Sequence, residues 1–119
     1  MNVDLRDKPR EFSVKKFTIK DYGKVHLGDD EMVSFVTKSG KEFDFVAKSW
    51  GFYATPSVNS RLKNEGFKTA LVVNENNQLY IMAVEKEKIE EFLAYTKDGQ
   101  NNTVLCWLDE WLLNNQGVK

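Results

Sequence analysis

Two pairs of segments have hydrophobic patterns that predict β-hairpins: apolar and polar side chains alternate in the first pair, and the second pair is largely apolar. Residues 33–37 and 42–48 alternate around the turn sequence Lys-Ser-Gly-Lys, and one face of the second arm is polar. Residues 67–74 and 79–84 flank a second polar turn, Glu-Asn-Asn-Gln. Both faces of this second pair are apolar, which is typical of central strands that are covered on both sides.

The pattern is less regular near the N-terminus. A strand is predicted between Phe12 and Ile19, although the alternation breaks at Lys15, and a shorter strand is predicted over residues 24–27. Residues 1–11 are charged and contain a proline, so we expect them to form a flexible N-terminal arm.

Three segments have features of helices. Thr55 is a preferred N-cap and Pro56 suits a first helical position, so we expect a helix that starts there and stops at Gly66. The apolar period becomes helical over residues 85–96 and again over residues 103–113. The apolar stripes consist of Ile89, Phe92, Leu93 and Thr96 in the first case, and of Val104, Trp107, Leu108 and Trp111 in the second.

These elements predict an α+β fold with a mostly antiparallel sheet of about five or six strands and three helices, in the order β-β-β-α-β-β-α-α. A length of 119 residues suits one domain, which we place at residues 12–113. Residues 114–119 are expected to be a frayed C-terminal tail.

Composition argues against several classes of protein. The formal net charge is −1, whereas general nucleic-acid binding usually needs a basic excess. A single cysteine, Cys106, cannot form an internal disulfide, which indicates a reducing compartment. The N-terminus has no apolar run, so we expect a cytoplasmic protein without a signal peptide or membrane span.

No arrangement typical of catalysis or metal binding is evident. His26 is the only histidine, and one histidine with one cysteine is too few for a zinc site. The acidic run at residues 29–31 is interpreted as a solvated turn rather than a cation site, and Glu42 with Asp44 as a solvent-facing strand edge. We therefore predict no catalytic residue, metal or cofactor.

The stretch Lys-Ser-Trp-Gly-Phe-Tyr-Ala-Thr-Pro-Ser has more aromatic residues than a bend needs. Trp50 or Tyr53 could stack on a base or a sugar ring. The favoured alternative places Trp50 and Phe52 in the core with Tyr53 half-buried. In the functional interpretation the start of the next helix adds polar groups for an anion, and the candidate ligand-binding residues are Trp50, Tyr53, Ser57, Asn59 and Arg61.

The last predicted helix raises a similar choice. Its wide apolar stripe packs on the sheet or forms a homodimer interface, for which Trp107 and Trp111 are the candidates. A chain of this size has difficulty covering both faces of a sheet, which supports the dimer.

Residues 24–112, with the segment Trp-Gly-Phe-Tyr-Ala-Thr-Pro-Ser and a following Arg-Leu, resemble a family of short uncharacterised bacterial proteins. The resemblance implies no activity and no catalytic residues. Our first hypothesis is a non-enzymatic binding or accessory module, with a small anionic or ring-bearing ligand at Trp50–Arg61. The alternatives are an enzyme that uses carboxylates and Arg61 on a sugar or nucleotide, and a binder of single-stranded nucleic acid.

Overall fold

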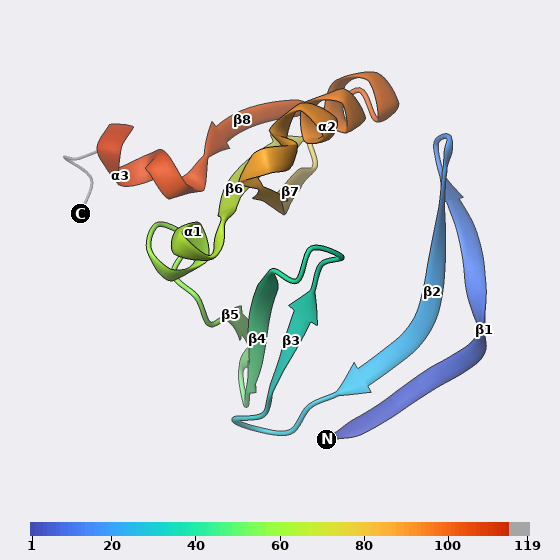
Figure 1. Cartoon of the computed structure of the whole chain (residues 1–119). Helices are drawn as coiled ribbons and strands as arrows, with labels where there is room; N and C mark the ends of the chain where they lie inside the picture. Colours follow the sequence, from blue (N-terminus) through green and yellow to red (C-terminus); the bar gives the residue numbers. More distant parts are fainter. Residues whose placement is uncertain (115–119) are drawn as a thin grey trace. The chain divides into compact units, whose positions relative to one another are not determined.

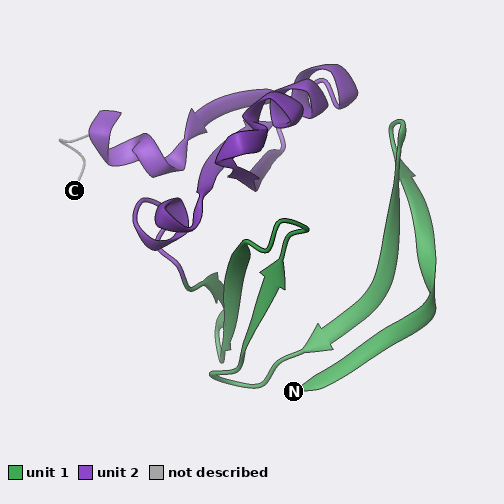
Figure 2. Cartoon of the chain, viewed as in Figure 1, with its two compact units in different colours: residues 1–55 green, residues 56–119 purple. Residues whose placement is uncertain are grey.

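The computed structural model describes residues 1–114, so the predicted tail lies outside the described residues except for Asn114. The described chain has an α+β fold with eight strands in three antiparallel sheets and three α-helices (Figure 1). It divides into two compact units, Met1–Thr55 and Pro56–Lys119 (Figure 2). The expectation of one domain over residues 12–113 stays a prediction.

The first unit begins with a long two-stranded hairpin of β1 (Asn2–Val14) and β2 (Phe17–His26). Residues 2–11, expected as an arm, belong to β1, and their flexibility stays a prediction. The expected strand between Phe12 and Ile19 is wrong, because the break at Lys15 is the turn of this hairpin, where φ is 55°.

The register gives the β1–β2 hairpin two different faces. Val3 pairs with Val25 and Phe12 with Ile19, so apolar side chains share one face, which also carries the ion pair of Arg10 with Asp21. The other face carries opposite charges directly across the strands, such as Glu11 and Lys20.

A three-stranded sheet with the order β3-β4-β5 completes the first unit: β3 (Met32–Val36), β4 (Glu42–Lys48) and β5 (Gly51–Ala54). The predicted hairpin around Lys-Ser-Gly-Lys is confirmed by the antiparallel pairing of β3 with β4. Phe43 stacks on Phe45 with ring centroids 4.8 Å apart, and Phe35 meets Phe45 edge-on at 5.7 Å. Val46 and Ala47 are the buried residues of β4.

The second unit is built on a three-stranded sheet with the order β7-β6-β8: β6 (Phe67–Val73), β7 (Leu79–Glu85) and β8 (Thr103–Trp107). The predicted hairpin of β6 and β7 is confirmed. Ala70 and Val72 of β6 are fully buried, as expected of a central strand. The same expectation is wrong for β7, which is an edge strand with exposed apolar side chains.

The first helix is shorter than predicted. α1 spans Arg61–Glu65 and its N-cap is Ser60. Thr55 does not cap it, because the Thr55 amide donates to the Asp44 carbonyl and extends the pairing of β5 with β4. The predicted stop is confirmed, since Gly66 has a left-handed φ of 107° at the C-cap.

The predicted helix at residues 85–96 is confirmed in α2 (Ile89–Ala94), which continues into a π-helical turn, Tyr95–Gly99. The predicted helix over residues 103–113 is wrong in its first half, which is strand β8. β-Branched and aromatic side chains favour a strand there, and β8 covers the second edge of β6. Only α3 (Trp111–Asn114), after a 3₁₀ turn at Leu108–Glu110, is helical.

Candidate functional site

The predicted ligand-binding residues are divided between the two units. Trp50 and Tyr53 belong to the first unit, whereas Ser57, Asn59 and Arg61 belong to the second.

The indole of Trp50 and the phenol of Tyr53 form an exposed pair of nearly parallel rings. Their centroids are 6.0 Å apart with an interplanar angle of 12°. Trp50 is 70% exposed and Tyr53 46% exposed. Phe52 is also largely exposed, so the interpretation that Trp50 and Phe52 are core residues is wrong for the described chain. Gly51, which follows Trp50 in the chain, has φ +143°, a conformation that residues with a side chain rarely adopt.

The pairing of β4 with β5 places a charged residue on the sheet face of Tyr53. Tyr53 lies opposite Val46 and Gly51 opposite Lys48, so Lys48 is on the same sheet face as Tyr53. The Lys48 ammonium forms an ion pair and hydrogen bond with Asp30, which raises the pKa of Lys48. Tyr53 therefore shares its sheet face with a cation that stays charged at neutral pH.

The three polar candidates of the second unit lie in and before α1. The Ser57 hydroxyl oxygen accepts a hydrogen bond from the Arg61 amide at 2.9 Å, so Ser57 organises the turn that enters the helix. Asn59 and Arg61 are exposed. α1 has only five residues, too few to develop the N-terminal dipole on which the expected anion site was based.

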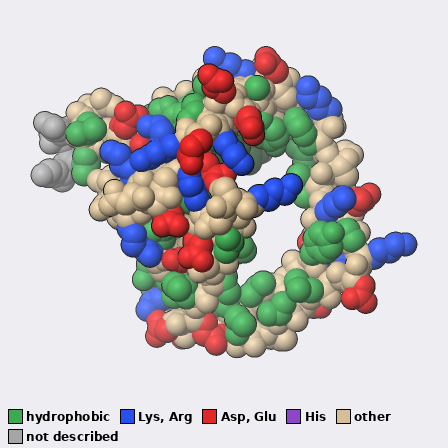
Figure 3. Space-filling model, viewed as in Figure 1, with side chains coloured by type: hydrophobic (Ala, Val, Ile, Leu, Met, Phe, Trp, Pro, Cys, Tyr) green, Lys and Arg blue, Asp and Glu red, His purple; other side chains and the backbone are tan. Residues whose placement is uncertain are grey.

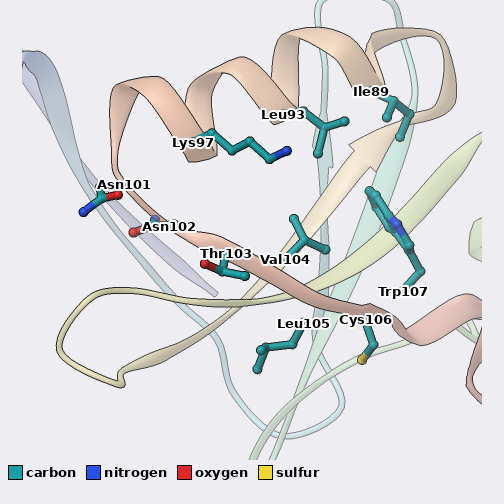
Figure 4. Close-up of a pocket in the computed structure, with 10 residues that line it drawn as sticks. All are labelled: Ile89, Leu93, Lys97, Asn101, Asn102, Thr103, Val104, Leu105, Cys106 and Trp107. Atoms are coloured by element: carbon teal, nitrogen blue, oxygen red, sulfur yellow. The ribbon is translucent and has the colours of Figure 1, made fainter.

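A concave feature, which the sequence did not predict, lies between α2 and β8 in the second unit (Figure 4). It is a cavity of about 640 Å³, and no residue of the stretch 50–61 lines it. Ile89, Leu93 and Lys97 come from the helical side, and Val104 and Trp107 from the strand. The cavity was hidden from sequence reasoning because the strand side was predicted to be helix.

The candidate dimer residues differ in their surroundings. The Trp107 ring packs against Phe92 with centroids 5.8 Å apart, and the Lys68 ammonium lies 4.9 Å from its centroid. Trp107 is therefore used within the second unit. Trp111 is 42% exposed.

The titratable groups of the described residues include one histidine and carboxyl groups with a lowered pKa. His26 is exposed at the end of β2. The carboxyl groups of Asp21, Glu31 and Asp109 each have a lowered pKa. For Glu31 the main cause is a hydrogen bond from the Gly28 amide, which makes residues 28–31 a tight turn. Within residues 1–114 no cluster of three or more His, Cys, Asp or Glu side chains could hold a metal ion.

No family model, curated protein or solved structure matches the chain. No helix within residues 1–114 is long and apolar enough to cross a membrane.

Proposed function

We propose that this chain is a binding or accessory module that holds a ring-bearing ligand on the Trp50–Tyr53 pair. The observation that carries the proposal is the exposure of two large, nearly parallel rings on one short segment. Exposed aromatic surface of this kind is typical of sites where a base or a sugar ring stacks. One such stack is worth about 1–3 kcal/mol for a nucleobase.

Lys48 narrows the choice of ligand. Lys48 lies on the same sheet face as Tyr53 and its ammonium is paired with Asp30, so a ligand with a phosphate or carboxylate next to its ring could share that cation. A nucleotide or a sugar nucleotide combines both features. The polar candidates Ser57, Asn59 and Arg61 belong to the second unit, and the proposal does not depend on them.

The test is intrinsic tryptophan fluorescence of the wild type and of Trp50→Phe, titrated with nucleotides, sugar nucleotides and oligonucleotides at low and high salt. A ligand-dependent change that is lost in Trp50→Phe is expected. Phe52→Leu is the matched control. Phe52 is nearly as exposed as Trp50 but lies on the opposite face of β5 from Tyr53, because side chains alternate along a strand. No response to any ligand, or an identical response in Trp50→Phe, would contradict the proposal.

The same experiment tests two alternative functions. A binder of single-stranded nucleic acid requires oligonucleotide affinity that falls steeply with salt. Acidic and basic side chains are interspersed on the face seen in Figure 3, in keeping with the net charge of −1. This balance of charge favours a small ligand over nucleic acid. An enzyme acting through carboxylates and Arg61 requires turnover of a bound sugar or nucleotide, which product analysis of the same mixtures would detect.

We further propose that the module is a homodimer. Trp107 and Trp111 are the interface residues predicted from the sequence, and Trp111 is the more exposed of the two. The resemblance to a family of short bacterial proteins that share the segment Trp-Gly-Phe-Tyr-Ala-Thr-Pro-Ser also remains a prediction.

A further inference from the structure

Strand β7 is an edge of its sheet without the usual protection. It comes last in the order β7-β6-β8, and its first six residues, Leu-Tyr-Ile-Met-Ala-Val, contain no charge and no proline. Edge strands normally carry charges, prolines or bulges that prevent pairing with another chain. The opposite edge, β8, is only five residues long and has a register shift at Leu105. The two edges therefore differ, and β7 is the one open to pairing.

Two hydrogen bonds define which backbone groups of β7 face outward. The Asn74 amide donates to the Gln78 carbonyl at one end of the β6–β7 ladder, and the Lys86 amide donates to the Gly66 carbonyl at the other. Hydrogen-bonded pairs alternate along an antiparallel ladder, so Tyr80, Met82 and Val84 bond to β6. The N–H and C=O groups of the residues between them point away from the sheet; these residues are Leu79, Ile81 and Ala83.

The side chains of the same three residues are also uncovered. Leu79 is 60% exposed and Ile81 61% exposed. They pair with Val73 and Leu71 of β6, on the face opposite Val72 and Ala70. Trp107, which contacts Phe92 of α2, pairs with Ala70, so α2 covers the other face. An unpaired backbone edge and an apolar face thus coincide at one strand.

We propose that a second copy of this chain pairs with β7 through its own β7, in antiparallel orientation about a two-fold axis at Ile81. This register places Ile81 against Ile81 of the second copy and Leu79 against Ala83, so every outward backbone group in the segment meets a partner. The two three-stranded sheets become one continuous sheet of six strands. An axis at Met82 would instead oppose Leu79 to the charged Glu85 and is disfavoured.

The inference rests on the proposed homodimer and gives it an interface different from Trp111. Its test is Ala83→Pro, which removes an outward N–H without touching a bond to β6, a position where an edge strand tolerates proline. Ala83→Val is the matched control, because it keeps the amide and adds apolar surface. Sedimentation of the full chain should show a dimer for the wild type and Ala83→Val. For Ala83→Pro we expect the dissociation constant of the dimer to rise roughly tenfold or more.

Amide hydrogen exchange separates edge pairing from loss of the fold. The Tyr80 and Met82 amides should stay protected in every variant, whereas those of Leu79 and Ile81 should gain protection only at concentrations where the wild type is dimeric. A wild type that remains monomeric overturns both the homodimer and this interface. A dimer that persists in Ala83→Pro but dissociates in Trp111→Ser overturns the β7 interface and leaves the homodimer standing.

Discussion

The buried carboxylate of Asp109 accepts a hydrogen bond from the backbone N–H of Thr69, at 2.9 Å and across forty residues of sequence. A second oxygen of the same carboxylate lies 3.1 Å from the Lys68 ammonium. The bond fastens the turn that follows β8 to the central strand of the second unit. It also makes Asp109 a carboxylate on which folding depends.

Stability of the second unit should therefore decrease in acid. Burial raises the pKa of Asp109, but the Thr69 amide and the Lys68 ammonium outweigh burial and hold the pKa below its usual value. A lowered folded-state pKa means that the unfolded chain binds the proton more readily. The stabilisation is present above the unfolded pKa and is lost as pH falls through the folded one. Urea unfolding between neutral pH and pH of about 3 should show this loss.

Asp109→Asn should lower the free energy of unfolding by about 2 kcal/mol at neutral pH. It should also make the free energy of unfolding depend less on pH in the acid range. Glu110→Gln is the control, because Glu110 contacts the same Lys68 ammonium but its side chain is 41% exposed. We expect Glu110→Gln to lower the free energy of unfolding by less than about 1 kcal/mol. An Asp109→Asn variant that keeps the wild-type dependence on pH would show that this contact does not control acid stability.

Thr69→Val should stabilise the protein. Thr69 is 1% exposed, and its hydroxyl oxygen has no hydrogen-bond partner in the described part of the chain. Leaving such a group buried costs about 1–3 kcal/mol, and valine replaces it with a methyl group of similar size. The backbone bond to Asp109 is kept. Thr69→Ser, which keeps the hydroxyl and loses the methyl, should be destabilised, and a denaturation midpoint for Thr69→Val below that of the wild type would refute the argument.

Leu62→Ala should be among the most destabilising truncations in the second unit. Leu62 is fully buried in α1, although that helix has only five residues. Loss of a buried leucine side chain costs about 2–5 kcal/mol. Leu113→Ala, at a leucine that is 67% exposed, should change the free energy of unfolding by less than about 0.5 kcal/mol. Equal effects of the two variants in urea unfolding would contradict the burial of Leu62.

Local patterns predicted the two hairpins because strand alternation and turn composition agree in the same few residues. The segment after residue 102 was misassigned because of its bulge. Val104 pairs with Val72 and Trp107 with Ala70, so two side chains three apart share a strand face. A spacing of three is also the spacing of a helix face, and the register shift that explains it depends on β6.

The candidate site shows where sequence reasoning stops. The aromatic content of residues 50–53 was evident, but aromatic side chains suit both a core and a binding surface. Exposure is decided by the neighbours that tertiary structure supplies, and Trp50 has few of them. The separation of Trp50 from Arg61 into different units likewise depends on contacts between distant residues. Neither property leaves a local signal in the sequence.

Gly23→Ala should open the β1–β2 hairpin. Gly23 pairs with Leu5 at φ +130°, and a Cβ there would overlap the carbonyl oxygen of Asp4. The overlap is with backbone, so no side-chain rotation relieves it. We expect loss of amide exchange protection in β1 around Leu5, while the β3–β4 hairpin keeps its own.

Gly40→Ala is the matched control for this substitution. Gly40 also has a positive φ, +90°, but a Cβ there would meet no atom within 4 Å. It should therefore show only the conformational strain of about 1–2 kcal/mol, confined to the β3–β4 turn. Protection of the Leu5 amide in Gly23→Ala equal to that of the wild type would mean that the hairpin does not require this close approach.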